Sequence, residues 1–150
     1  MAINVLRTAK YMGEISDWSL SHLHLQKLLY LSHMFFLGQN AGEPLVQGHF
    51  EAWDYGPVHP ELYHKAKIFG ADPVKNIFRS CDDLEEGLER NTLDYVFTAL
   101  RGVSGAQLVA MTHQEEGAWA KHYEPGRRGV IIPDDDILEE FESLKRKAGL

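Results

Sequence analysis

Histidine is the residue type in this sequence with the greatest capacity for chemistry, and the chain has eight. His22 and His24 are two positions apart, so they would point the same way on a strand and would diverge on a helix. The surrounding residues favour a helix, and we therefore expect no shared metal ion. Neither an HExxH nor a CxxC motif occurs. A site assembled from histidines that are distant in the sequence stays open, because folding can bring them together.

The serine, cysteine and aspartate residues that could take part in catalysis or metal binding stand at positions where a structural role explains their presence. No GxSxG motif is present, and Ser104 stands where it caps a helix. Cys81 precedes two aspartates, an acidic neighbourhood in which we expect an unreactive thiol. The run Asp134-Asp135-Asp136 suits the positive end of a helix dipole better than a metal site. We therefore predict no catalytic residue, no metal ligand and no cofactor.

Aromatic residues gather around one expected turn. Trp53, Tyr55, His59 and Tyr63 surround the pair Gly56-Pro57. Tryptophan and tyrosine are enriched among the residues that dominate protein–protein binding. The four side chains are therefore candidates for a partner-binding surface. The alternative is that Trp53 and Tyr63 fill the core while Tyr55 stiffens the turn.

Length and charge limit the classes of function that the chain can have. Its 150 residues suit one domain, spanning residues 1–150, and 44% apolar with 25% charged residues is ordinary for a globular protein. The formal net charge of -7 disfavours nucleic acid as a partner. Basic residues cluster only at Arg127-Arg128 and Lys145-Arg146-Lys147. A single cysteine excludes an intramolecular disulfide.

No segment has the character of a membrane anchor or a secretion signal. The first residues lack the apolar centre of a signal peptide. The longest apolar stretch is interrupted by Ser32 and His33 and falls far short of the roughly 20 residues that span a bilayer. We expect a cytoplasmic protein without a membrane partner.

The pattern of apolar residues and helix-ending residues predicts a mainly α fold. We expect a compact single domain of six or seven helices with at most a small β-hairpin. Ser21 and the Ser104/Gln107 pair have the spacing of helix caps, and Gly13 and Gly102 serve as stop signals. The predicted helices cover about 3–12, 22–37, 60–69, 82–102, 105–113 and part of 114–122, with a last helix that follows an N-cap at Asp134 and runs to about 144. The extended segments fall within 45–53. The helix over 22–37 is apolar on more than one side, which indicates a central position.

Several blocks of residues, in this order and spacing, resemble a known family. They are Leu25 to Tyr30, Glu51 to Val58, Glu61 to Tyr63, Ala106 to Leu108, Met111 to His113, Trp119 and Ile131-Ile132. Over nearly the whole chain the sequence resembles the SocA-like, or Panacea, domain family of phage-associated proteins. The residues that stand out in these blocks are Gln26, Lys27, Tyr30, Gly56, Pro57, Thr112, His113 and Trp119. The segment 114–118 departs from the family in lacking a proline that is often found there.

The resemblance implies an antitoxin of a toxin–antitoxin system that is not an enzyme. Its partner would be a cognate toxin protein, which is neutralised directly or delivered to a AAA+ protease such as ClpXP. The shared blocks bring no catalytic residue with them. Two alternatives stay open: a prophage-associated regulator that binds DNA, and a histidine- or metal-dependent hydrolase. The segment 106–113 has no lysine or arginine for DNA contacts, which counts against the regulator.

Overall fold

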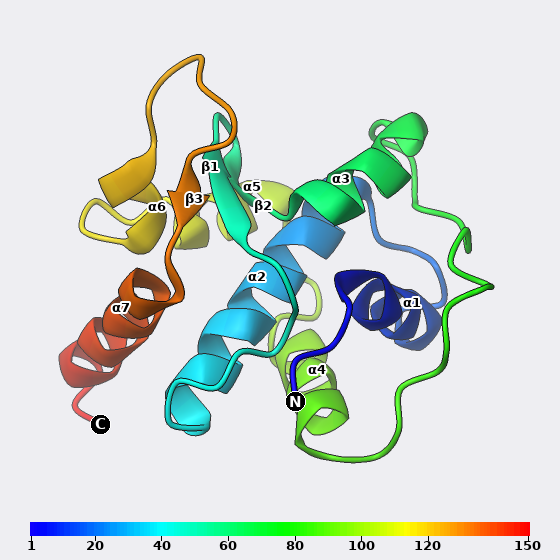
Figure 1. The fold of residues 1–150 in the computed structure, drawn as a ribbon, viewed down its shortest axis with the longest axis horizontal. Helices are drawn as coiled ribbons and strands as arrows, with labels where there is room; N and C mark the ends of the chain where they lie inside the picture. The colour runs from blue at the N-terminus through cyan, green and yellow to red at the C-terminus, as the bar shows by residue number, and fades with distance from the viewer.

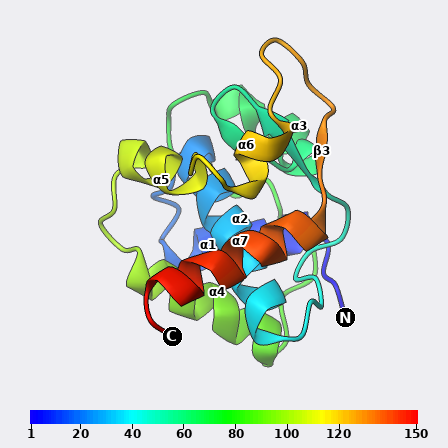
Figure 2. The same ribbon diagram turned by 90° about the vertical axis from the view of Figure 1, so that its left-hand side faces the viewer.

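One helix forms the centre of the molecule. The computed structural model describes residues 1–150, and in it α2 (His22–Gln39) runs through the middle of the fold (Figure 1). Helices α1 (Val5–Ile15), α4 (Leu88–Ala99), α5 (Gly105–Thr112) and α7 (Asp134–Lys147) all pack against it. Figure 2 shows α5, α6 (Ala118–His122) and α7 together on one side of α2. The predicted central position of this helix is confirmed, because it is buried on several sides at once.

Hydrogen bonds from local side chains fix the first turns of three helices. Ser21 Oγ accepts the backbone N–H of His24 at 3.2 Å, and this caps α2 as predicted. Ser104 and Gln107 form the predicted capping box of α5, with two bonds of 2.9 and 3.1 Å. Asn4 caps α1 by accepting the N–H of Leu6 at 2.9 Å.

The sheet is small and antiparallel. It has the order β2-β1-β3, with β1 Phe50–Trp53, β2 Gly56–Val58 and β3 Ile131–Ile132. The first two strands form a small hairpin, in which Trp53 pairs with Gly56. The expected turn at Gly56-Pro57 is wrong: both residues belong to β2, which lies outside the predicted 45–53, and the turn is Asp54-Tyr55, because Pro57 pairs with Ala52 across the ladder. The mainly helical class is confirmed, and the sheet extends the hairpin by a two-residue strand that pairs Ile132 with Phe50.

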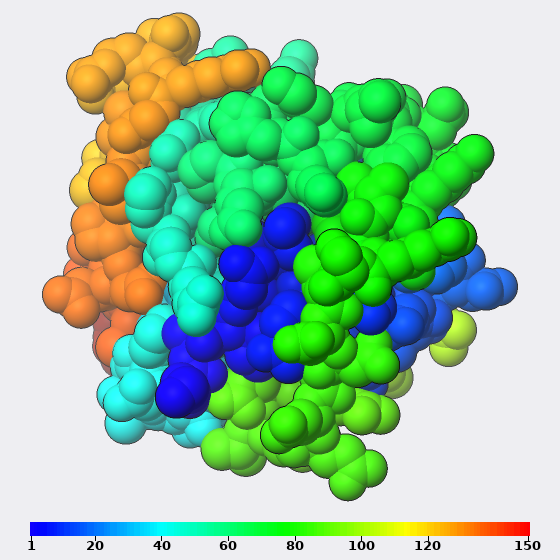
Figure 3. Space-filling model, turned by 45° about the vertical axis from the view of Figure 1, so that its right-hand side comes forward, coloured from blue at the N-terminus to red at the C-terminus, as the bar shows by residue number.

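Two helix boundaries differ from prediction because of contacts between distant residues. Gly13 does not end α1; it lies buried inside the helix, and the Trp18 ring occupies the space that a side chain there would need. The predicted helix start at Asp82 or Asp83 is also wrong, since α4 begins at Leu88. Arg7 donates instead to the backbone carbonyls of both aspartates, at 3.3 and 2.8 Å. The N-terminal segment accordingly lies against the 70–90 region on one face of the molecule (Figure 3).

Smaller corrections concern the third and last helices. The helix predicted over 60–69 is α3 (Pro60–Ala66) followed by a single 3₁₀ turn, η1 (Lys67–Phe69), and Ile68 faces solvent rather than the core. The last helix is capped one residue earlier than predicted, by Pro133. Asp134 is therefore its first residue, and its carboxylate lies 2.8 Å from His33 Nε2.

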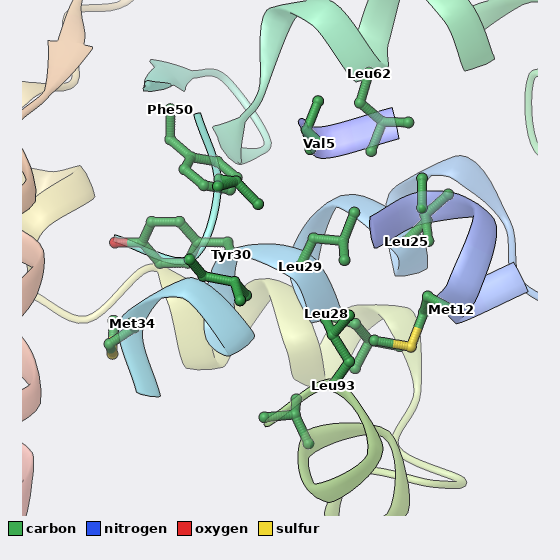
Figure 4. Packing of buried hydrophobic residues seen from close by; sticks show 14 of the residues in the cluster. Val5, Met12, Leu25, Leu28, Leu29, Tyr30, Met34, Phe50, Leu62 and Leu93 are labelled. Carbon is green, nitrogen blue, oxygen red and sulfur yellow. The ribbon is translucent and has the colours of Figure 1, made fainter. Parts of the chain in front are cut away.

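The core is one continuous cluster of 25 buried apolar residues around α2. Leu25, Leu28 and Leu29 meet Val5, Met12, Leu62 and Leu93 from three neighbouring helices, as Figure 4 shows. Tyr30 continues the cluster towards β1, where its ring meets the ring of Phe50 edge-on at 5.1 Å. No helix is both long and apolar enough to cross a membrane.

Candidate functional site

A pocket of about 440 Å³ opens where α2, the β1–β2 hairpin, α3 and the loop before β3 meet. That loop rises beside the hairpin at the top of Figure 1. Three of the predicted binding residues, Trp53, Tyr55 and Tyr63, line the pocket together. Its size lies in the range of pockets that bind small ligands or single side chains.

One wall of the pocket is aromatic. The rings of Trp53 and Tyr63 meet edge-on with 4.5 Å between their centres. The Arg128 guanidinium lies 4.3 Å above the Trp53 ring and 5.4 Å from the Tyr63 ring. Trp53 Nε1 donates to Glu51 at 2.9 Å, and the same carboxylate oxygen accepts the backbone N–H of Gly129 at 3.1 Å. Glu51 thus joins the wall to the loop that carries Arg128.

The hairpin tip brings Tyr55 to the surface. Tyr55 is 74% exposed, whereas Trp53 is only 9% exposed. The two-residue turn Asp54-Tyr55 joins the paired residues Trp53 and Gly56. Of the four predicted binding residues, Tyr55 is therefore the one that offers most of its side chain to a partner.

His59, the fourth residue of the predicted surface, is 3% exposed and lies beneath the pocket. The side-chain amide of Gln26 accepts its backbone N–H at 2.9 Å and donates to its carbonyl at 3.2 Å. The His59 ring meets Phe50 edge-on at 5.3 Å, and its Nε2 lies 2.9 Å from the Gln47 carbonyl. These contacts give His59 the role of fixing the chain between β2 and α3.

His22 forms part of the pocket at the start of α2. Its ring lies 5.6 Å from that of Tyr63, and its Nε2 is 3.1 Å from the Gln26 amide nitrogen. Burial, followed by the nearby Lys27 charge, lowers the pKa of His22 to about 4, so the ring is neutral at pH 7. His24 points elsewhere, towards the carbonyl of Val103 at 3.1 Å. The predicted divergence of the two histidines is confirmed.

Lys27 is a buried cation at the inner end of the pocket. It is 1% exposed, and its ammonium donates to the Pro57 carbonyl at 3.2 Å. No carboxylate forms an ion pair with it, and burial lowers its pKa to about 8. Buried lysines without an acidic partner are destabilising. Packing alone therefore does not explain why a lysine occupies position 27.

A stack of three rings supports the hairpin from behind. His113 and Trp119 are nearly parallel with 3.8 Å between ring centres, and Tyr123 stacks on Trp119 at 4.5 Å. Trp119 Nε1 donates to the Trp53 carbonyl at 2.8 Å, and the Tyr123 hydroxyl donates to Asp54 at 2.6 Å. The stack therefore holds the start of the Asp54-Tyr55 turn, where β1 ends.

The residues of the family blocks fall into two groups in space. Gln26, Lys27, Gly56, Pro57 and His113 lie at or directly behind the pocket. Tyr30 and Thr112 lie in the interior: Tyr30 is fully buried, and the Thr112 hydroxyl donates to the Leu108 carbonyl at 3.1 Å. Trp119 links the groups through its bond to the hairpin.

Sequence reasoning missed several residues that complete the pocket. Arg128 appeared only as half of a basic pair, and nothing in its spacing placed it above Trp53, 75 positions earlier. His22 and Asp54 also line the pocket. The presence of arginine and aromatic residues was visible in the sequence, but their proximity was not.

The acidic run at the start of α7 is divided between two histidines. Asp134 lies 2.8 Å from His33, and Asp136 lies 2.6 Å from His122. No group of three or more histidine, cysteine, aspartate or glutamate side chains is arranged to hold a metal ion. The run therefore joins α7 to α2 and α6.

We expect replacement of Lys27 by methionine to stabilise the protein by about 2 kcal/mol at pH 7, because it removes a buried charge. Burial puts the pKa of Lys27 in the folded protein at about 8, below the ordinary lysine value of 10.5 that holds in the unfolded chain. As the pH rises, the folded protein therefore loses the Lys27 proton before the unfolded protein does. The free energy of unfolding of the wild type should consequently increase between about pH 8 and pH 10.5. The advantage of Lys27→Met should be complete below pH 8 and disappear across that window. Urea denaturation of both proteins at pH 7 and pH 10 measures it, and a pH-independent difference would contradict it.

The structure is a small helical domain whose pocket has an aromatic wall covered by an arginine. The chain belongs to the antitoxin SocA-like, Panacea domain family, whose sequence profile matches residues 25–120. It is 37% identical over 151 residues to a protein named Antitoxin SocA from Caulobacter vibrioides (strain NA1000 / CB15N), an alignment that covers 86% of this chain and 76% of that protein. No solved structure matches the chain.

Proposed function

We propose that this protein is a cytoplasmic antitoxin that neutralises a cognate toxin protein by binding it, without catalysing a reaction. The observation that carries the proposal is the likeness to Antitoxin SocA over most of both chains. The structure adds a suitable surface, since aromatic residues and arginine beside a pocket are the composition of binding hot spots. The net charge of -7 favours association with a toxin that has a basic face.

The proposed contact surface is centred on the hairpin tip. Tyr55 makes the largest direct contact, and the exposed edges of Trp53 and Tyr63 continue the surface into the pocket. Buried His59 acts beneath them by fixing the chain that joins β2 to α3. The ring stack behind the hairpin keeps the tip rigid, and this limits the entropy lost on binding.

Tyr55→Ala should abolish or strongly reduce toxin binding while leaving the fold intact. The side chain is 74% exposed, so its loss should change stability by less than about 0.5 kcal/mol. Loss of a central aromatic contact costs about 2 kcal/mol, or roughly 30-fold in affinity. The measurement is co-purification and calorimetry with the product of the adjacent gene, the candidate toxin. Tyr95→Ala is the matched control, because Tyr95 is 57% exposed on α4 and lies outside the pocket.

Wild-type affinity retained by Tyr55→Ala would place the interface elsewhere on the molecule. A neighbouring product that is harmless alone and does not co-purify with this chain would refute the proposed function itself. We further propose that neutralisation occurs either by masking or by delivery to a AAA+ protease such as ClpXP. Toxin half-life in cells with and without the protease separates the two: delivery shortens the half-life only when the protease is present, and masking leaves it unchanged.

A further inference from the structure

The pocket contains two cations that are not neutralised within the protein. Lys27 uses one of its three donors, on the Pro57 carbonyl, and has no ion-pair partner. Arg128 stacks on Trp53 and makes neither an ion pair nor a side-chain hydrogen bond. By contrast, neighbouring Arg127 is paired with Glu124 at 2.7 Å. Two unpaired cations in one pocket are unexpected in a chain of net charge -7.

The remaining polar groups of the pocket do not neutralise these charges. Asp54 is the single carboxylate of the lining, and it accepts a hydrogen bond from Tyr123 at 2.6 Å. His22 is uncharged at pH 7 because burial lowers its pKa to about 4. His113, which approaches Lys27 across Gly56, also has its pKa lowered by burial. The pocket is therefore a local site of positive charge.

The rest of the lining is mainly apolar. The rings of Trp53 and Tyr63 meet edge-on and form an aromatic corner, and Val58 and Leu23 contribute aliphatic surface. Such a corner offers aromatic surface to a planar ring, and the volume of about 440 Å³ leaves room for a ring with a short side group. The cations lie at different depths, with Lys27 buried and Arg128 exposed at the opening.

We propose that this pocket is a binding site for an aromatic carboxylate. The ring of the ligand lies in the corner between Trp53 and Tyr63, and its carboxylate is stabilised by the positive charge that Lys27 and Arg128 give to the pocket. This site shares Trp53 and Tyr63 with the proposed toxin surface, but its test uses small probes and does not rest on toxin binding. A free aromatic acid presents this chemistry, and so does the C-terminal aromatic residue of a polypeptide.

Calorimetry with phenylacetate and its neutral isostere phenylacetamide tests the charge requirement. We expect phenylacetate to bind and the amide to bind at least tenfold more weakly. Arg128→Gln and Lys27→Met should each weaken phenylacetate binding at least tenfold. Arg101→Gln is the matched control, since Arg101 also lies over an aromatic ring, at 5.5 Å from the Phe97 centre, but outside the pocket. Arg128 is exposed, so its variant should fold even if the Lys27 variant does not.

A second readout separates a direct charge contact from a change of shape. Because Lys27 has a pKa of about 8, a carboxylate bound to it favours the protonated form, and binding at pH 8.5 should take up protons. Calorimetry in buffers of different ionisation enthalpy measures this uptake, which should disappear in Lys27→Met. The other charged or titratable groups around the pocket are unchanged in that variant; they are His22, Asp54, Tyr55, Tyr63, His113, Arg127 and Arg128.

A peptide ending in phenylalanine, tested with a free and with an amidated C-terminus, distinguishes the two sources of the carboxylate. Binding of the free-acid peptide alone identifies a polypeptide terminus as a ligand. Binding of phenylacetate without either peptide identifies a free small molecule. Equal affinity for acid and amide, or no binding of any of these probes, would overturn the proposal.

Discussion

Gly56→Val is expected to lower the free energy of unfolding by about 3 kcal/mol or more. Two effects combine at this position. Its φ angle of +113° is one that residues with a side chain rarely adopt. A Cβ atom there would lie 2.9 Å from His113 Nε2 and 3.0 Å from both Lys27 Cε and Nζ. Neither neighbour moves easily, because Lys27 is buried and His113 is stacked on Trp119.

A matched substitution separates backbone strain from crowding. Gly126 also has a positive φ, +74°, but nothing lies within 4 Å of where its Cβ would be. Gly126→Val should therefore show the backbone effect alone, about 1 kcal/mol. Urea denaturation at pH 7 measures both variants. Equal losses would mean that Lys27 and His113 do not constrain this turn.

Features set by neighbouring residues could be predicted from the sequence. The starts of α2 and α5 depend on Ser21 and on Ser104 with Gln107, whose partners lie within three positions. The first strand of the hairpin likewise follows from a short aromatic segment, although the Gly-Pro pair lies in the second strand and not in the turn. In each case the interacting residues lie within a few positions of one another, so the residue types in that short segment are sufficient to predict the local structure.

Features set by distant residues could not be predicted. Asp82 and Asp83 have the composition of a helix start, yet Arg7 of α1 binds their carbonyls and Lys10 forms a 2.8 Å ion pair with Asp83. Ile131 and Ile132 become a strand because β1 has a free edge about eighty positions earlier. In these cases, contacts between distant elements decide the local structure. The residue type at one position does not show which of these contacts will form.

Part of the candidate site could be predicted from the sequence for the same reason, namely that its aromatic residues are close in the chain. Trp53, Tyr55 and Tyr63 are close in the sequence, and the structure places them around one pocket. The cations of that pocket come from α2 and from the loop before β3, on opposite sides of the hairpin in the sequence. The aromatic wall was therefore predictable, whereas the positive charge beside it required the fold.

Trp53→Ala is expected to lower the free energy of unfolding by about 3–5 kcal/mol, since the ring is 9% exposed and removing it leaves a cavity. The substitution removes the edge-on contact with Tyr63 and the surface on which Arg128 lies. It also removes the N–H that binds Glu51, although Glu51 keeps its bond to Gly129. Thermal and urea denaturation measure the loss.

Trp53→Phe is the control that tells packing from recognition. It keeps most of the buried ring and lacks the Nε1 donor, so it should cost about 1–2 kcal/mol, much less than alanine. If both variants followed this order and the phenylalanine variant still bound the toxin, Trp53 would contribute mainly by holding the wall in place. A Trp53→Ala protein that is as stable as wild type and no longer binds the toxin would show the reverse: the ring would belong to the interface, and the core would not depend on it. Stability and binding must therefore be measured on the same preparations, because each interpretation predicts a different pairing of the two results.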